Sequence, residues 1–307
     1  MGEQARIWVF HAGALGDHVM IWPLLRAMVR SGADVTLVCD AGKGRLAVAE
    51  IGVRWEQAEL PRYTRLWTGE YDGEPERGVG RVLTFVADPA TEGGCRWAVG
   101  AAAMFPGAAL EFIGPPGSAS RQRAWREARV EELGAVAARE TASGPVVVHV
   151  GAGSRAKMWP MACWEALAAD LRSRGLEVAA IAGEVEAERL DAAERAALAR
   201  LGGRFVETLE DLAAVIRGAR LFIGADTGPT HLAAQLGVPT LALFGPTDPT
   251  LWSPRGPAVR VLAPQRPAEM KWLAPATAAS AAGAMLKNRA GPEAGVRNGS
   301  LPTPGRW

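Results

Sequence analysis

The segment Phe222–Pro249 constrains this chain most, because it has the pattern of two buried strands joined by a glycine-rich turn and a short helix. The polar run Asp226–His231, Asp-Thr-Gly-Pro-Thr-His, falls where the first strand gives way to the helix. Backbone N–H groups lack partners at such a helix start, and the helix dipole is positive there. This environment attracts a phosphate or pyrophosphate. The segment therefore predicts a site for a nucleotide diphosphate.

Strands and helices alternate along the rest of the chain, in two halves with the same plan. Each half is expected to begin with a buried strand, a glycine-bearing loop, a helix and a second strand. In the first half these elements are the strand Ile7–Phe10, a helix over His18–Ser31 and the strand Asp34–Cys39. In the second half they are Pro145–Val150, the helix Met161–Arg174, the strand Leu176–Ala182, and helices over Glu184–Leu201 and Leu209–Arg217. Such alternation predicts parallel sheets covered by helices.

Two α/β domains are expected, with a boundary in the small, Pro/Gly-bearing stretch Thr141–Pro145. They cover residues 1–143 and 144–265. Residues 266–287 are expected to form a last helix interrupted by Pro275, and residues 288–307 a disordered tail. The carboxyl ends of both sheets should face one cleft, where ligands bind in open α/β sheets.

Composition excludes several other classes. A net charge of +1 gives no bulk electrostatic case for nucleic acid. Cys39, Cys95 and Cys163 are scattered and odd in number, which argues against a disulfide framework or a cysteine metal site. No signal peptide and no apolar run of about 20 residues is recognisable, so a cytoplasmic location is expected, with peripheral membrane contact left open.

The first glycine-bearing loop is Gly13-Ala-Leu-Gly-Asp17. It does not match G-x-G-x-x-G, which argues against a nicotinamide-dependent oxidoreductase. Its glycines allow close approach of backbone N–H groups to a ligand. Asp17 falls at the cap or first turn of the following helix, where a carboxylate is favoured by about 1 kcal/mol. The alternative is a carboxylate at the cleft edge that takes a proton from an attacking hydroxyl, and both roles are compatible.

The second loop, Gly151–Pro160, offers a further set of polar groups. Gly151, Gly153 and Ser154 are candidates for a phosphate cradle. Lys157 is a candidate for a cation that neutralises a leaving diphosphate. Trp159 either packs on the ligand or staples the helix that Pro160 opens. Each of these residues also has an ordinary structural explanation, as a loop or packing residue.

Two charged stretches have two interpretations each. Glu186, in an acidic run after a strand, either stabilises a helix N-terminus or accepts the hydroxyls of a ribose. The basic stretch Arg121–Arg129 is either a solvated helix face or a contact for an anionic acceptor or a membrane surface. His11 and His18 flank the first loop, and His149 ends a strand, with no metal-ligand spacing among them.

Three blocks in this order resemble the lipopolysaccharide heptosyltransferase family of glycosyltransferases. They are Gly13–Asp17 followed by Pro23-Leu-Leu-Arg26, then Gly151–Pro160, then Gly224–Pro249. The family pattern looks like G-x-[LI]-G-D with P-x-L-R, then H-P-G-[AS] with K-x-W-P, then D-[ST]-G-x-x-H and G-P-[TS]. The likeness covers residues 6–40 and 145–256 well and residues 41–140 little. His149-Val150 replaces the usual His-Pro, and Met158 stands where Arg is common.

The resemblance implies a GT-B fold, in which two Rossmann-like domains enclose the active site. It implies a nucleotide-sugar substrate, usually ADP-heptose, inversion at the anomeric carbon, and no metal or other cofactor. Asp17 matches the proposed general base, Lys157 the lysine near the donor phosphates, and Glu186 falls near the ribose-binding acid. The residues expected to contact the donor are Gly13, Ala14, Leu15, Gly16, Ser154, Trp159, Glu186, Asp226, Thr227, Gly228, Pro229, Thr230 and His231.

We therefore expect an inverting, metal-independent transferase that moves a sugar, heptose from ADP-heptose, to a glycan or glycolipid acceptor such as lipopolysaccharide inner core. Because residues 41–140 carry no family pattern, three alternatives stay open. One is another nucleotide sugar, one is a protein acceptor, and one is a nucleotide-sugar-binding protein without activity.

Overall fold

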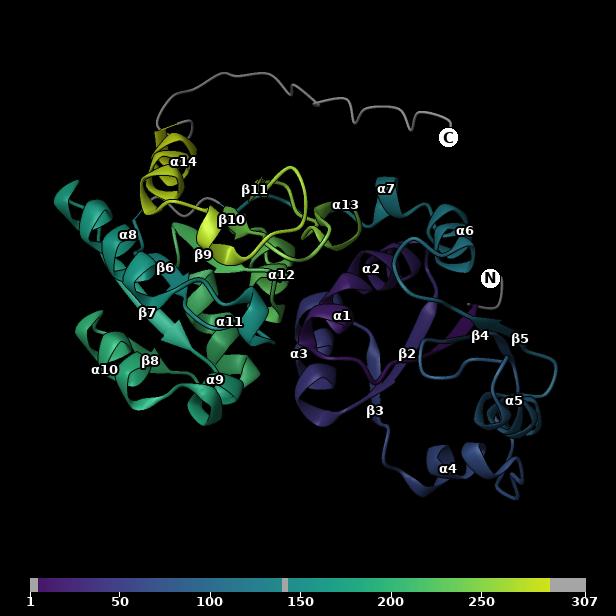
Figure 1. Ribbon diagram of the computed structural model, residues 1–307. Coiled ribbons are helices and arrows are strands. Elements are labelled where there is room, and N and C mark those ends of the chain that lie inside the picture. Colours follow the sequence, from purple (N-terminus) through teal and green to yellow (C-terminus); the bar gives the residue numbers. More distant parts are fainter. Residues whose placement is uncertain (1–4, 140–142, 288–307) are drawn as a thin grey trace.

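The computed structural model describes residues 5–139 and 143–287, which form two parallel sheets placed side by side and flanked by helices (Figure 1). All neighbouring strands within each sheet run parallel. Parallel neighbours need crossover connections, and the helices of the chain supply them. Among the described residues no helix is long and apolar enough to cross a membrane.

The first sheet has the strand order β3-β2-β1-β4-β5. Its strands are β1 Arg6–Phe10, β2 Asp34–Cys39, β3 Arg54–Gln57, β4 Val79–Thr84 and β5 Ala109–Phe112. The helices of this half are α1 Leu15–Met20, α2 Trp22–Arg30, α3 Ala41–Ile51, α4 Pro61–Thr64, the 3₁₀ turn η1 Arg65–Thr68, α5 Glu92–Met104, α6 Ala119–Glu127 and α7 Val130–Leu133.

The second sheet has the order β11-β10-β9-β6-β7-β8. Its strands are β6 Val146–His149, β7 Val178–Ala182, β8 Arg204–Phe205, β9 Leu221–Ala225, β10 Thr240–Leu243 and β11 Val259–Leu262. The helices of this half are η2 Arg155–Lys157, α8 Met161–Ser173, α9 Glu184–Arg189, α10 Ala192–Arg200, α11 Leu209–Arg217, α12 Gly228–Gln235, α13 Pro249–Trp252, η3 Met270–Trp272 and α14 Pro275–Lys287.

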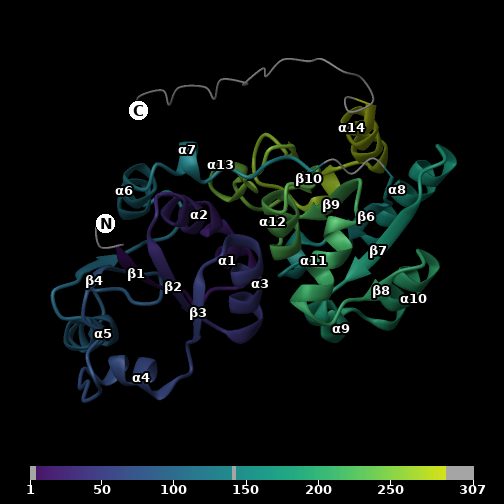
Figure 2. The same ribbon diagram turned by 180° about the vertical axis from the view of Figure 1, so that it is seen from behind.

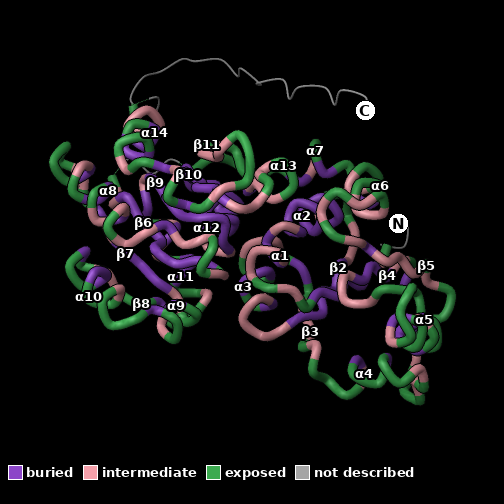
Figure 3. Tube along the Cα trace, in the orientation of Figure 1, coloured by how far each residue is buried: buried purple, intermediate pink, exposed green. Residues whose placement is uncertain are grey.

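The hydrophobic core continues from one half of the molecule into the other. Side chains alternate along β1, so Ile7 and Val9 pack on one face of the sheet and Trp8 and Phe10 on the opposite face. The cluster that contains Ile7 extends through α1, α2 and α3 to α11 and α12 of the second half. Figures 2 and 3 show α1 and α3 facing α11 and α12, with buried chain on both sides. The two halves are therefore held together by apolar packing.

Polar contacts add to this interface. The Arg26 guanidinium on α2 donates to the Gln235 side-chain oxygen on α12 at 2.7 Å, and both residues are buried. Gln235 in turn donates to the backbone oxygen of Arg255 at 2.6 Å. At the rim, Arg45 on α3 pairs with Glu210 on α11 at 2.9 Å. The buried pair fixes the lateral placement of α2 against α12, since an unpaired buried guanidinium would be costly.

Two expected helices are each divided in the structure. The helix predicted over His18–Ser31 begins earlier, at Leu15, and is interrupted at Ile21, before Pro23 opens the next turn. The helix predicted over Glu184–Leu201 is interrupted between α9 and α10, where the Asp191 carboxylate accepts the Glu194 backbone N–H at 2.8 Å and caps a new helix. A proline in the first turn of α2 and a capping carboxylate before α10 thus outweigh the longer helical pattern.

The last helix was also predicted with the wrong start. It begins at Pro275, which opens the helix where the prediction had it interrupt one. Proline is tolerated in the first turn because the N–H that it lacks has no intrahelical acceptor there. The predicted tail, residues 288–307, and residues 141–142 of the predicted boundary lie outside the described residues.

Candidate active site

Three loops meet where the two sheets face each other, and each follows a strand at a change of winding direction. In the first sheet β1 lies between β2 and β4, and in the second β6 lies between β7 and β9. The chain therefore winds outward in both directions from these strands. Crevices at such switch points are the usual ligand sites of open α/β sheets. The loops after β1, β6 and β9 are the three predicted blocks.

The turn after β9 holds a buried carboxylate. Oδ2 of Asp226 lies 2.9 Å from Nζ of Lys157, and its Oδ1 lies 3.4 Å from Nε2 of His231. Burial would raise the pKa of Asp226, but the hydrogen bond from His231 and the hydrogen bond and positive charge of Lys157 outweigh it and hold that pKa below its ordinary value. Lys157 reaches the turn because the short helix η2 after β6 carries it there. Two of the predicted blocks are thus joined by an ion pair.

The start of α12 offers fewer polar groups than predicted. Thr227 is the N-cap residue, and Gly228 begins the helix at a position where the helix supplies no acceptor for its N–H. Thr230 is fully buried, and its hydroxyl donates to the backbone oxygen of Ala225 at 2.6 Å. The Thr230 hydroxyl therefore braces the strand-to-helix turn, and contact of Thr230 with the donor stays a prediction.

The first loop lies directly against this turn. Helix α1 begins at Leu15 with Ala14 as its N-cap, so Asp17 stands in the first turn and is not the cap. A Cβ on Gly228 would lie 2.8 Å from Cβ of Leu15 and 3.0 Å from the Gly16 backbone nitrogen. Only glycine allows this approach. Asp17, from one sheet, is thereby brought to the same region as the α12 N-terminus, from the other.

A cavity of about 300 Å³ opens between these loops, and we call it the interdomain cavity. Several predicted residues line it: Ala14, Leu15, Gly16, Glu186, Thr227, Gly228 and Pro229. Sequence reasoning missed the apolar wall opposite, formed by Val206, Leu209 and Leu212 around the start of α11. The position of α11 after a sheet strand could have indicated this wall. Predominantly apolar walls with a few polar groups are typical of small-molecule sites.

Glu186 lines the interdomain cavity and stabilises the fold at the same time. Its Oε2 accepts the Gly183 backbone N–H at 2.9 Å, which satisfies the N-cap N–H of α9, and lies 3.7 Å from Nε2 of His149. Burial lowers the pKa of His149, against the opposing charge of Glu186. A Cβ on Gly151 would lie 2.1 Å from the Glu186 carboxyl carbon, so Gly151 makes room for the carboxylate. Both sequence interpretations of Glu186 are compatible with this position.

Trp159 occupies the core. Its side chain is 1% exposed, its indole N–H donates to the Leu273 backbone oxygen at 3.1 Å, and its ring packs edge-on against Trp164. The structure therefore supports the stapling alternative for Trp159 and not contact with a donor. Ser154 precedes η2, and the backbone oxygen of Gly153 accepts from Arg189 at 2.7 Å.

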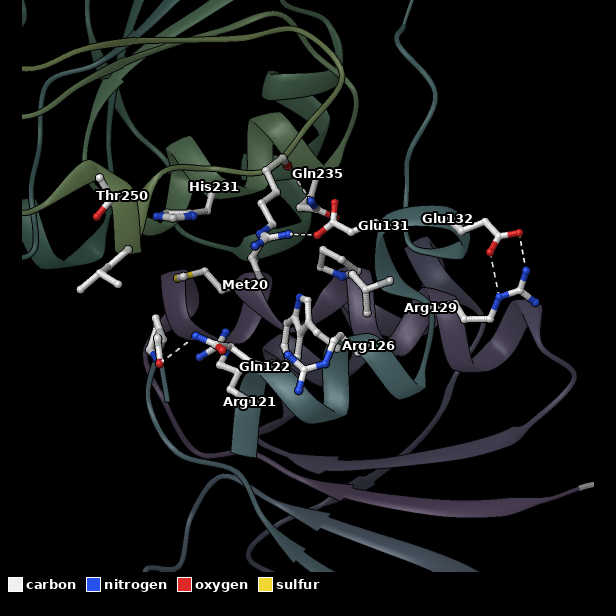
Figure 4. A pocket seen from close by; sticks show the side chains of 18 residues that line it. Met20, Arg121, Gln122, Arg126, Arg129, Glu131, Glu132, His231, Gln235 and Thr250 are labelled. Carbon is white, nitrogen blue, oxygen red and sulfur yellow. Dashed lines mark hydrogen bonds and ion pairs between the residues drawn. The ribbon is translucent and has the colours of Figure 1, made fainter. Parts of the chain in front are cut away.

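A larger groove of about 710 Å³ lies between α1, α6, α7, α12 and α13, and we call it the arginine groove (Figure 4). Its arginines are Arg121, Arg126, Arg129 and Arg255. Arg129 pairs with Glu132, and Arg255 reaches across from the second half to Glu131 at 2.8 Å. His231 also lines the groove, so the groove adjoins the Asp226 turn.

Arg121 is the most enclosed of these cations. Its guanidinium lies over the Trp125 ring, 4.8 Å from the centroid. Burial lowers the pKa of Arg121 to about 10, against the opposing charge of Asp17, and Arg255 lowers it further. The helix with these two interpretations, a solvated face or an anionic contact, therefore turns one arginine into the groove, toward Asp17. Among the described residues, no cluster of three or more His, Cys, Asp or Glu is arranged to hold a metal ion.

Comparison with known sequences identifies the family. The family model described as glycosyltransferase family 9 (heptosyltransferase) matches residues 118–275, about half of the chain. The chain belongs to glycosyltransferase family 9. The matched region contains two of the three loops, Gly151–Pro160 and Asp226–His231.

Individual relatives of this family 9 chain agree. Lipopolysaccharide heptosyltransferase 1 of Pseudomonas aeruginosa is 43% identical over 99 residues, which are 30% of this chain and 26% of that protein. The alignment thus spans about a quarter of the curated relative. A glycosyl transferase family 9 structure from Veillonella parvula has a TM-score of 0.69 at 17% identity and covers 94% of this chain and 99% of its own.

A structure of Escherichia coli heptosyltransferase WaaC with ADP has a TM-score of 0.64 at 18% identity and covers 92% of this chain and 99% of its own. These likenesses confirm the predicted fold, a GT-B arrangement of two parallel α/β sheets. At such identities they establish the architecture alone.

Proposed function

We propose that this family 9 protein is an inverting glycosyltransferase that moves heptose from ADP-heptose to a glycan acceptor of the lipopolysaccharide inner core. One observation carries the proposal: helix α1, which carries Asp17, packs on the start of α12, beside the Lys157–Asp226 pair. Family membership and the ADP held by the WaaC structure support the choice of donor. We propose a cytoplasmic site of action at the inner membrane face, where a nucleotide sugar and a lipid-linked acceptor would meet.

The donor is proposed to lie in the interdomain cavity with its diphosphate toward the α12 N-terminus. The Gly228 N–H and the positive end of the helix dipole suit a diphosphate. Lys157 would supply the positive charge for the leaving nucleotide, in place of a metal cofactor. Negative charge grows on the diphosphate as the glycosidic bond breaks, so these contacts strengthen in the transition state and lower the barrier. The apolar wall of Leu209 and Leu212 would receive the base.

Asp17 is proposed as the general base. It would take the proton of the acceptor hydroxyl while that oxygen attacks the anomeric carbon from the face opposite the departing diphosphate, which inverts the configuration. Its position in α1, across the interface from Gly228, is suited to that attack. A general base contributes roughly 10²–10⁴-fold to the rate.

The acceptor is proposed to bind in the arginine groove. Its cations suit an anionic glycan, and the groove adjoins His231 on the donor side and Arg121 beside Asp17. Arginine is favoured for carboxylates and phosphates because its planar fork bonds two oxygens at once. An acceptor hydroxyl held here would have Asp17 within reach.

The test is transfer of heptose from ADP-heptose to a deacylated inner-core acceptor, followed by product mass and anomeric configuration. Asp17→Asn should lower kcat by about 10²–10⁴-fold with ADP affinity retained. Asp72→Asn, an exposed carboxylate paired with Arg65, is the matched control and should keep the parental rate. Parental transfer by Asp17→Asn would overturn the base assignment. Donor binding without turnover on any acceptor would favour a binding protein, and turnover of another nucleotide sugar only would replace the donor.

A further inference from the structure

His11, at the end of β1, is tied to the loop that carries Asp17. The Gly13 backbone N–H donates to Nδ1 of His11 at 3.2 Å. The His11 backbone N–H donates to the Val38 oxygen at 3.0 Å, so the backbone that carries the imidazole is anchored to the sheet. A ring nitrogen accepts a hydrogen bond only when it carries no proton, so this contact requires neutral His11 with its proton on Nε2.

Lys43, on α3, binds the backbone C=O of the same glycine, which belongs to the next peptide group. Its ammonium donates to the Gly13 backbone oxygen and pairs with Oδ2 of Asp40 at 2.6 Å. Asp40 is itself fixed, because its Oδ1 accepts the Lys43 backbone N–H at 3.1 Å as the N-cap of α3. The side chain of Lys43 is 13% exposed. Both hydrogen-bonding groups of Gly13 are therefore engaged by side chains from outside the loop.

Gly13 transmits this anchoring to Asp17 by direct contact. A Cβ on Gly13 would lie 2.8 Å from Cε1 of His11 and 2.9 Å from Cβ of Asp17, so the Gly13 backbone is wedged between the two side chains. No methyl group fits between them, since real contacts of this kind are longer. The His11 ring, the Gly13 backbone and Asp17 thus form one continuous packed row.

We infer that His11 and Lys43 are positioning residues that hold Gly13 by both its amide groups and so set where the Asp17 carboxylate stands. This role rests on the proposed function, in which Asp17 is the base. A displacement of about 1 Å in a reacting group lowers a rate by up to about 10²-fold, so such an anchor has a catalytic consequence.

The charges around His11 keep it in the form that the contact needs. Burial lowers the pKa of His11 to about 4, and the charges of Lys43 and Arg121 lower it further, against the opposing charge of Asp40. The His18 ring packs edge-on against it at 5.2 Å between centroids. Lys43 therefore both binds the loop and favours neutral His11.

Two substitutions of His11 test the anchor. Asn at position 11 can accept the N–H two residues on, as in an Asx turn, whereas Leu cannot. His11→Leu should lower kcat by roughly 10- to 100-fold, and His11→Asn should restore it to within about threefold of the parent. Lys43→Met removes the hydrogen bond to the Gly13 oxygen and should also lower kcat by roughly 10- to 100-fold. Calorimetry with ADP counts the folded sites in each variant, so misfolding is not mistaken for slow chemistry.

Hydrogen exchange at the Gly13 amide supplies a readout that does not depend on activity. Protection should be retained in the parent and His11→Asn and lost in His11→Leu. Unchanged protection and kcat in His11→Leu, or equal loss of kcat in both His11 variants, would overturn the positioning role. Parental transfer by Asp17→Asn, measured alongside, would overturn the base assignment instead, and the Gly13 exchange pattern would still decide whether the anchor exists.

Discussion

Replacement of Gly228 by Ala should weaken nucleotide binding by displacing one half of the interdomain cavity from the other. The added methyl carbon would lie 2.8 Å from Cβ and 2.9 Å from Cγ of Leu15, and 3.0 Å from the Gly16 backbone nitrogen. Leu15 and the start of α1 must move, and Leu15 lines the cavity. Overpacking of this kind costs about 1–3 kcal/mol. If the ADP-bound protein bears this cost and the free protein does not, the affinity for ADP decreases by roughly 5- to 150-fold, since 1.4 kcal/mol corresponds to a factor of ten.

The assay is titration calorimetry with ADP on the parent, Gly228→Ala and a control, Gly42→Ala. Gly42 lies on α3 at the same interface, and a Cβ there would meet Cδ1 of Leu209 at 3.4 Å, an ordinary contact. The control should keep the parental affinity for ADP within about twofold. Alanine is a better helix former than glycine, and its methyl group fits at position 42 without displacing a neighbour. Parental affinity in Gly228→Ala would refute the reasoning, because it would mean that the first loop and α12 do not enclose the ligand together.

Three further predictions concern stability and the acceptor. Trp159→Ala should lower the free energy of unfolding by about 3–5 kcal/mol in urea denaturation, with ADP affinity of the folded protein retained; loss of affinity at unchanged stability would restore a donor contact for Trp159. Arg121→Gln should raise the KM for an anionic acceptor with little change in that for the donor, and an equal rise in both would contradict an acceptor site in the arginine groove. Burial lowers the pKa of His11 to about 4 and of His18 to about 3, from 6.5 in each case, with neighbouring charges adding to the effect. The unfolded chain therefore binds more protons, so unfolding free energy should be constant above pH 6.5 and fall below it by up to about 1.4 kcal/mol per pH unit for each histidine, down to its folded pKa. Denaturant melts of the parent and His18→Leu from pH 7 to 4.5 would show it, and equal slopes in both would contradict a neutral, buried His18.

The parallel sheets and the loops that meet between them could be predicted from the sequence because both depend on local chemistry. Buried strands such as Asp34–Cys39 and glycine-bearing turns such as Gly13–Asp17 are recognisable residue by residue. The carboxyl ends of parallel strands lie along one edge, so the loops that follow them can be grouped before the fold is known. The ion pair of Lys157 with Asp226 was not predicted, although both residues belong to loops in that group.

Roles that depend on burial could not be derived in the same way. Thr230 and Trp159 have side chains that suit a ligand. In the structure both are buried and donate to backbone oxygens, which only the packed fold reveals. The Arg26–Gln235 contact joins residues far apart in the chain, and no spacing rule predicts it. The sequence did not decide between a solvated face and an anionic contact for Arg121, because its burial near Asp17 depends on the fold.

The most direct test of a donor site between the two sheets is a nucleotide panel titrated by thermal shift: ADP, UDP, GDP and their sugar conjugates, ADP-heptose included. A ligand at 100 times its dissociation constant should stabilise the protein by about 2.7 kcal/mol. Stabilisation by ADP and ADP-heptose, diminished in Gly228→Ala, is the predicted result. Stabilisation by UDP or GDP sugars alone would contradict the donor, and no stabilisation by any of them would contradict the site.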